Sequence, residues 1–173
     1  MTSTPAPTLY RLRSITSRDR AALTRFYAAL SPDSRASRFH GGGLSIPDGT
    51  ATFFCGPDHE HREGIVAESF EGTGEPTIIG HLCLEPADGE TAEMAIAIAD
   101  AWQHHGVGRA MLDQAIRWAR AHGFARLLAS MLGGNTGMAL LLRSVGYPIT
   151  YGATDGDTVD AYLDLRHPRP QAA

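Results

Sequence analysis

The residues best suited to chemistry lie in one stretch, residues 93–111, where Glu93 precedes a loop that contains Gly106 and Gly108. A carboxylate can accept a proton from a reacting group. Glycines at the start of a helix let an anion approach main-chain N–H groups that have no partner, and the helix dipole adds about half a positive charge there. The stretch therefore combines a candidate general base with a candidate phosphate-binding loop.

A strand and a helix must hold these residues in place. Apolar side chains alternate with glutamate and alanine over residues 93–99, which predicts a strand with one core face and one nearly bare face. After the loop, apolar residues recur at helical spacing up to Gly123, a typical C-terminal residue of a helix. Two common phosphate motifs are excluded, because a dinucleotide fingerprint requires glycine at Met111 and a P-loop requires Lys-Ser or Lys-Thr at Arg109-Ala110.

The loop resembles the acyl-CoA signature Q/R-x-x-G-x-G/A of the GNAT superfamily of N-acyltransferases, through Gln103, Gly106 and Gly108. Within that superfamily, the chain further resembles the catalytic domain of bacterial Pat-type protein lysine acetyltransferases. This second likeness rests on Ala-Glu-Met-Ala at 92–95, on Asn135 with Met138, and on Leu-Ser-Pro-Asp-Ser at 30–34 followed by Arg38-Phe39. One departure is His104, because Pat-type loops commonly carry glycine directly after the glutamine.

The resemblance implies an α/β fold, the GNAT fold, with a mixed central sheet of six to seven strands flanked by about four helices. Patterning along the chain independently suits this fold. The predicted strands cover residues 9–15, 65–67, 76–84, 93–99, 126–131 and 159–165, with room for one more near the end of the chain. The predicted helices begin near Ser17, Ser31, Gly106 and Asn135, and residues 41–49 are expected to be flexible.

The resemblance also implies acetyl-CoA as the co-substrate. Main-chain groups on the strand would pair with the pantetheine arm, and one N–H would polarise the thioester carbonyl. The loop would hold the pyrophosphate, with added charge from Arg109 and from His104 or His105. The residues expected to bind the cofactor are Ile96, Ala97, Ile98, Gln103, His104, His105, Gly106, Val107, Gly108, Arg109, Asn135 and Met138.

Some of these residues have an alternative structural role. Asn135 is also a good helix N-cap, and the two roles are compatible. Met138 equally suits a hydrophobic core, which is the favoured interpretation. His104 and His105 would also fit a solvated loop without any ligand.

Glu93 is expected to act as the general base, directly or through a water, as the matching glutamate does in Pat-type enzymes. The alternative is an edge carboxylate paired with an arginine. Many members of the superfamily place a tyrosine seven residues after the asparagine to protonate the departing thiolate, yet that residue here is Leu142. Tyr147 and Tyr151 are the nearest substitutes, and the general acid stays unassigned.

Other polar and sulfur-containing residues indicate no second site. The run His59-Glu60-His61 has no third ligand at recognisable spacing, so it predicts a solvated turn and no metal. Cys55 and Cys83 are far apart in apolar surroundings, which predicts buried thiols rather than a disulfide.

Length and composition predict one domain over residues 1–173, with a disordered Pro-rich tail from about residue 168. The chain has 43% hydrophobic and 20% charged residues and a formal net charge of −4, with scattered arginines, which argues against a nucleic-acid partner. Because no apolar run is long enough to cross a bilayer, we expect a cytoplasmic protein without a membrane partner. A homodimer is a family-level expectation.

The sequence therefore predicts an acetyl-CoA-dependent N-acetyltransferase that transfers acetyl directly from the CoA thioester to a primary amine, with a protein lysine as the first choice. One alternative acceptor is a small-molecule amine such as an antibiotic, polyamine or amino acid, which a cavity lined by several carboxylates would favour. Another is a non-catalytic acyl-CoA-binding sensor, which the missing tyrosine would favour. The sequence leaves the acceptor, the acyl-chain length and the oligomeric state open.

Overall fold

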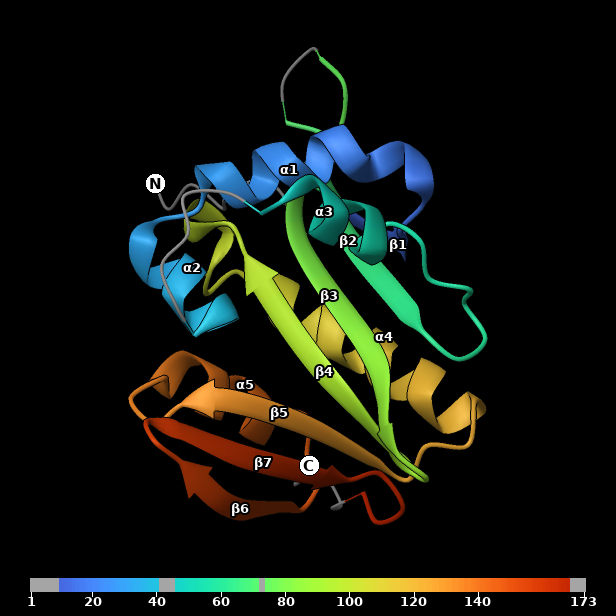
Figure 1. Cartoon of the computed structure of the whole chain (residues 1–173), viewed down its shortest axis with the longest axis vertical. Helices are drawn as coiled ribbons and strands as arrows, with labels where there is room; N and C mark the ends of the chain where they lie inside the picture. The colour runs from blue at the N-terminus through green and yellow to red at the C-terminus, as the bar shows by residue number, and fades with distance from the viewer. Residues whose placement is uncertain (1–9, 41–45, 72–73, 169–173) are drawn as a thin grey trace, which may run out of the picture.

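The structure, a computed structural model, describes residues 10–40, 46–71 and 74–168 (Figure 1). Most of the expected tail, residues 169–173, and most of the glycine-rich stretch, residues 41–45, lie outside this part. The strands are β1 (Tyr10–Ser14), β2 (Glu63–Ser69), β3 (Thr77–Asp88), β4 (Thr91–Ile98), β5 (Arg126–Leu132), β6 (Ile149–Asp155) and β7 (Thr158–Asp164). The helices are α1 (Arg20–Ala29), α2 (Pro32–Phe39), α3 (Asp48–Phe54), α4 (Val107–Ala121) and α5 (Thr136–Ser144), with short 3₁₀ helices η1 (Ser17–Asp19) and η2 (Asp100–Trp102).

The strands form one seven-stranded sheet in the order β1-β2-β3-β4-β5-β7-β6. Neighbouring strands are antiparallel except β4 and β5, which are parallel. This confirms the predicted α/β fold with its mixed sheet. Within the described residues, no helix is both long and apolar enough to cross a membrane.

The parallel pair at the centre of the sheet is short. Residues Thr91–Glu93 of β4 pair with Arg126–Leu128 of β5, and the two strands then diverge (Figure 1). β4 remains paired with β3 as far as Ile98, while β5 remains paired with β7 as far as Leu132. Beyond Glu93 on β4 and beyond Leu128 on β5, each strand therefore has one edge without a strand partner. Such an edge carries unpaired N–H and C=O groups.

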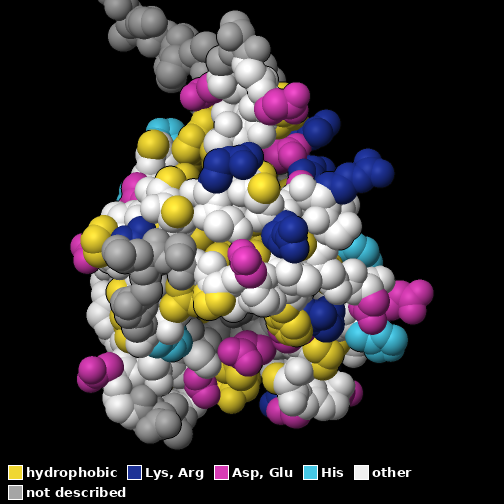
Figure 2. Space-filling model, turned by 45° about the horizontal axis from the view of Figure 1, so that its top comes forward, with side chains coloured by type: hydrophobic (Ala, Val, Ile, Leu, Met, Phe, Trp, Pro, Cys, Tyr) yellow, Lys and Arg dark blue, Asp and Glu magenta, His cyan; other side chains and the backbone are white. Residues whose placement is uncertain are grey.

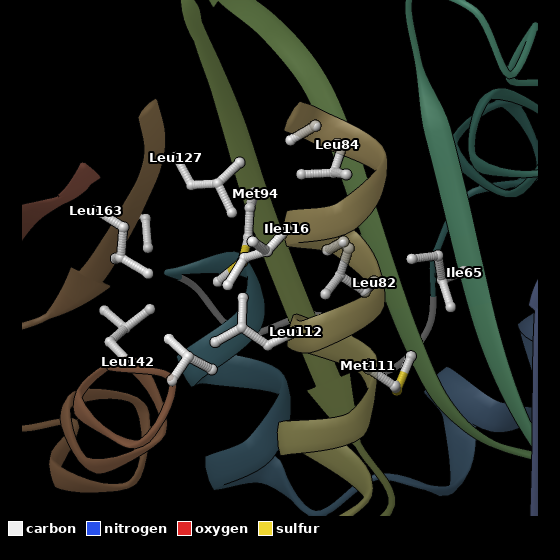
Figure 3. Packing of buried hydrophobic residues seen from close by; sticks show 14 of the residues in the cluster. Ile65, Leu82, Leu84, Met94, Met111, Leu112, Ile116, Leu127, Leu142 and Leu163 are labelled. Atoms are coloured by element: carbon white, nitrogen blue, oxygen red, sulfur yellow. The ribbon is translucent and has the colours of Figure 1, made fainter. Parts of the chain in front are cut away.

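Two helices, α4 and α5, cover the sheet face that carries Met94. The apolar stripe of α4, which includes Met111, Leu112 and Ile116, packs against this face (Figure 3). Leu142 of α5 belongs to the same cluster and is 0% exposed. This layer fixes the position of α4, and with it the start of the helix that follows the loop.

Helices α1, α2 and α3 lie on the opposite face, over the half of the sheet that contains β2, β3 and β4 (Figure 1). The prediction of a nearly bare alanine face is wrong at Ala97, which is 8% exposed and belongs to a second hydrophobic cluster with Tyr27 and Val66. Small side chains on β4 let the helical layer approach the strand closely. Glu93, nearer the start of β4, remains exposed.

One element, the helix α3, goes beyond the predicted set. The sequence around Pro47-Asp48-Gly49 predicts flexibility, yet Pro47 is the N-cap of the short helix α3, whose Ala51 is fully buried. The strand β6, for which the sequence left room, pairs with β7 at the edge of the sheet. With α3 included, five α-helices flank the sheet rather than about four. Both cysteines are free and buried, as predicted.

A buried polar pair joins the helical layer to β3. Tyr27 Oη and His81 Nδ1 are 2.8 Å apart, and both side chains are 0% exposed. Burial lowers the pKa of His81 from 6.5 to about 3, and the nearby positive charge of Arg38 contributes in the same direction. His81 is therefore neutral in the native protein throughout the mildly acidic range.

We predict that this histidine makes the protein sensitive to acid. Between pH about 6.5 and about 3 the unfolded chain binds a proton at His81 that the native protein does not, so the free energy of unfolding should fall as the pH falls, by about 1.4 kcal/mol per unit. Urea unfolding between pH 7 and 5 should show a shallower pH slope in His81→Gln, while the exposed-site control His122→Gln keeps the wild-type slope. Equal slopes in all three proteins would contradict this role.

Candidate functional site

The unpaired edge of β4 presents main-chain groups toward the gap between β4 and β5. Ala99 donates its N–H to Ile79 of β3, 2.8 Å away, whereas the carbonyl of Ile98 accepts from the Gln103 side chain outside the ladder. Because main-chain groups alternate in direction along a strand, those of Ile96 and Ile98 lie on the open edge and those of Ala97 pair with β3. Ile96 can thus bind an extended ligand as an added strand would, whereas the main chain of Ala97 is already used by β3.

The loop after β4 leads into α4 through a left-handed residue. Gly106 is the N-cap of α4 with φ 83°, and no side chain caps the helix there. The first N–H groups of α4 are therefore available to an anion, with the helix dipole behind them. His104 also adopts a left-handed conformation, with φ 62°. This is the position at which the resembled loops carry glycine, and the left-handed backbone accounts for that preference but not for the histidine found here.

The side chains of two predicted cofactor residues, Arg109 and His105, already have partners within the protein. Arg109 pairs with Asp113, 3.0 Å away, and donates to the carbonyl of Ser144 at the end of α5. It lines a cavity of about 350 Å³ beside α4 that also contains Tyr147. His105 Nδ1 lies 2.7 Å from the carbonyl of Gln103 within the loop itself. Main-chain groups, rather than Arg109, are thus the anion donors that this geometry supplies.

Glu93 lies where β4 and β5 separate. Its neighbour across the β3–β4 ladder is Glu85, and its neighbour on β5 is Leu128. Two nitrogens of Arg62 contact Glu85, at 2.5 Å and 2.9 Å, so the arginine that reaches this position neutralises Glu85. In the part of the chain that the structure describes, Glu93 makes no hydrogen bond or salt bridge, although its charge acts on the nearby Arg38 guanidinium. Glu93 remains free to meet an ammonium group.

A second arginine lies on the same face and was not singled out as a site residue. Arg38, in the last turn of α2, stacks near Phe39 and Phe54 and places Nη2 3.2 Å from Cys83 Sγ. Cys83 is two residues from Glu85 on β3, so the guanidinium lies on the Glu93 face of the sheet. Burial raises the pKa of the Cys83 thiol, which therefore stays neutral beside this cation.

The start of α5 has the predicted cap. Asn135 Oδ1 accepts from the N–H of Met138 at 2.9 Å, which confirms the N-cap role. Met138 packs against the main hydrophobic cluster, in line with the favoured core interpretation. Tyr147 lies at the cavity beside α4, where its hydroxyl is 3.5 Å from Arg120, and Tyr151 is 49% exposed on the edge strand β6. These positions leave the general acid unassigned.

The histidines of the segment 59–61 each contact one carboxylate. His59 Nδ1 lies 2.8 Å from Glu63, and His61 Nδ1 lies 2.9 Å from Asp58. Among the residues that the structure describes, no group of three His, Cys, Asp or Glu side chains could hold a metal ion. On the face shown in Figure 2, Asp and Glu side chains lie in both the upper and the lower part, while most of the arginines lie in the upper part.

Comparisons with known proteins agree with this geometry. The model of the Acetyltransferase (GNAT) family matches residues 18–147. The GNAT domain of PAT from S. lividans shares 26% identity and a TM-score of 0.79, with 90% of each chain covered. The putative acetyltransferase yncA from Salmonella typhimurium, solved with its cofactor acetyl-CoA, shares 20% identity and a TM-score of 0.71, with 95% of this chain and 99% of that chain covered. A separate comparison with curated proteins finds no match.

We predict that the two loop glycines respond differently to an added methyl group. Gly106→Ala should lower the free energy of unfolding by about 1 kcal/mol, because φ 83° is unfavourable for any residue with a Cβ. Gly108→Ala should be neutral or slightly stabilising, because its Cβ would lie 3.5 Å from Leu141, an ordinary contact, within a helix. Urea unfolding measures both variants. A larger loss in Gly108→Ala than in Gly106→Ala would show that the loop is built differently.

Proposed function

Because this chain belongs to the acetyltransferase (GNAT) family and is an acetyl-CoA-dependent N-acetyltransferase, we propose that it acetylates the side-chain amine of a protein lysine, with Glu93 as the general base. The observation that carries the choice of acceptor is the likeness to the GNAT domain of S. lividans PAT, at 26% identity over 90% of both chains. Ala-Glu-Met-Ala at 92–95 and Leu-Ser-Pro-Asp-Ser at 30–34, the residues on which the resemblance to Pat-type enzymes rests, add support to this choice.

The absence of lysine from the sequence is a second observation that supports a lysine acceptor. All 15 residues counted as Lys or Arg in the sequence are arginines. A guanidinium has a pKa above about 12 and stays protonated, so it does not accept an acetyl group under ordinary conditions. An enzyme that acetylates exposed lysine side chains would otherwise modify its own surface. These 173 residues offer no side-chain amine to their own activity.

The proposed reaction begins with removal of a proton from the acceptor ammonium. Glu93 is exposed and unpaired, so its carboxylate can take that proton directly or through a water. The neighbouring Glu85 is held by Arg62, which limits repulsion between the two carboxylates that face each other across the ladder. The free amine then attacks the thioester carbonyl carbon.

The open edge of β4 would hold and activate the thioester. The N–H of Ile96 faces the gap and can donate to the pantetheine arm, and a neighbouring N–H of this edge can polarise the carbonyl as negative charge develops on its oxygen. Collapse of the adduct forms the amide and breaks the C–S bond. By analogy with cysteine, the thiol of the departing CoA has a pKa of about 8.5, so the thiolate can leave without a dedicated general acid. The loop at 103–108 would hold the pyrophosphate.

A small-molecule amine is the second candidate acceptor. It is favoured by the second carboxylate, Glu85, directly opposite Glu93, since paired carboxylates attract compact cations. Its weakness is that Glu85 is already engaged by Arg62. A sensor without turnover is the third candidate, and its support is the buried Leu142 where many family members have a tyrosine.

The proposed roles predict opposite defects in two variants. Glu93→Gln should lower turnover about a hundredfold or more, the usual size of general-base catalysis, and leave acetyl-CoA affinity within about twofold. Gly108→Glu should weaken acetyl-CoA at least about tenfold, because it adds a negative charge at the phosphate loop. Calorimetry measures affinity and CoA release measures turnover. Similar loss of affinity in both variants would contradict the assignment.

The acceptor proposal predicts which amines are consumed. CoA release from acetyl-CoA should be fastest with lysine-containing proteins and peptides, and slow with polyamines, free amino acids and aminoglycosides. Each rate should fall in Glu93→Gln, which serves as the background. Faster turnover of a free amine would shift the function to small molecules. Tight acetyl-CoA binding without turnover on any acceptor would support the sensor.

A further inference from the structure

Asp100 joins α2 to the loop that precedes α4. Its carboxylate accepts from the N–H of Ser31 at 2.9 Å, from Ser31 Oγ at 2.6 Å and from Ser34 Oγ at 2.8 Å. Ser31 is the N-cap of α2 and Ser34 lies in its first turn. The carboxylate therefore binds the positive end of a helix that is nearly seventy residues earlier in the chain.

Gln103 extends this contact to β4. Its side-chain N–H₂ group donates to Ser34 Oγ at 3.1 Å and to the carbonyl of Ile98 at 3.2 Å. The glutamine of the acyl-CoA signature thus bridges the end of β4 and the start of α2. One continuous hydrogen-bond network runs from the cofactor strand, through the loop, to the helix.

The far end of α2 reaches the acceptor side of the sheet. Arg38 contacts Cys83 there, on the face that carries Glu93. Within α2, Arg35 is the sole buried residue, and its guanidinium donates to the carbonyls of Ala28 and Leu30. A helix with so little buried apolar surface depends on its polar contacts for its position.

The charge of Asp100 links the start of α2 to the loop that precedes α4. Burial alone would raise its pKa, but hydrogen bonds from Ser31 and Ser34 outweigh this, so its pKa lies below the usual range and the group is ionised. An ionised carboxylate three residues before Gln103 would repel a pyrophosphate arriving at the loop. When α2 is docked, its hydroxyls, its N–H and its dipole offset that charge. A bound pyrophosphate therefore favours the docked helix.

We propose that Asp100 is a positioning residue that couples cofactor binding at the loop to the placement of α2, so that acetyl-CoA binding completes the acceptor side of the site. This coupling rests on the proposed function, since it takes the face of Glu93 and Arg38 to be the acceptor side. Linkage requires that it act both ways, so a docked α2 also strengthens cofactor binding.

Hydrogen exchange of α2, with CoA as the probe, tests this coupling. In the wild type, saturating CoA should slow exchange of the amides of residues 33–39 about tenfold, a typical coupling. In Asp100→Asn, which removes the charge but keeps the shape, the slowing should fall below about twofold while CoA still binds with an affinity within a few-fold of wild type. Ser34→Ala, which breaks the bridge between Asp100 and Gln103, should give the same result.

Asp33→Asn is the matched control. Asp33 lies in the same first turn of α2, and in the described part of the chain it makes no hydrogen bond or ion pair, so removing its charge should leave the protection unchanged. CoA binding without protection of α2 in the wild type, or full protection in both Asp100→Asn and Ser34→Ala, would overturn the coupling alone. No CoA binding by the wild type would overturn the proposed function as well.

Discussion

The site depends on hydrogen bonds that the sheet does not make. β4 and β5 begin as a parallel pair and separate after Glu93, so the facing main-chain groups of both strands lack partners in the ladder. Buried polar groups of the main chain rarely stay unpaired, which makes this gap a place for a ligand that can pair like a strand. The separation requires each strand to be held from its other side. The long β3 does this for β4, and β7 does it for β5.

Charge around the gap is arranged so that one carboxylate stays free. Glu85 and Glu93 are direct neighbours across the ladder, and Arg62 engages the first. Arg38 is held among aromatic rings and a neutral thiol, and its positive charge also interacts with Glu93 without forming a salt bridge. Buried or half-buried cations are stable when packing and stacking replace part of their hydration. The helical layer thus shapes the electrostatics of the site as well as its walls.

Local signals in the sequence predicted the elements that carry the site. Ser31 and Asn135 are helix caps as predicted, and Gly106 adopts the left-handed backbone that the loop requires. The hydrogen-bond partners of several side chains in the site could not be predicted, because these partners lie far away in the sequence. Gln103 bonds to Ser34 of α2, and Arg109 donates to the carbonyl of Ser144 at the end of α5. The helix α3 escaped prediction because its Pro-Asp-Gly start is also typical of a turn.

His104 gives the loop a property that glycine would not. A glycine there would reach φ 62° without strain, whereas histidine adopts it at a cost of about 1–2 kcal/mol. The side chain, however, removes much of the conformational freedom that glycine has in an unliganded loop. That restriction does not favour φ 62°, because the left-handed region is the one that a Cβ disfavours. The shape of the loop therefore depends on contacts made by its other residues, such as those of Gln103 with Ser34 and with the carbonyl of Ile98, which hold His104 in a strained conformation.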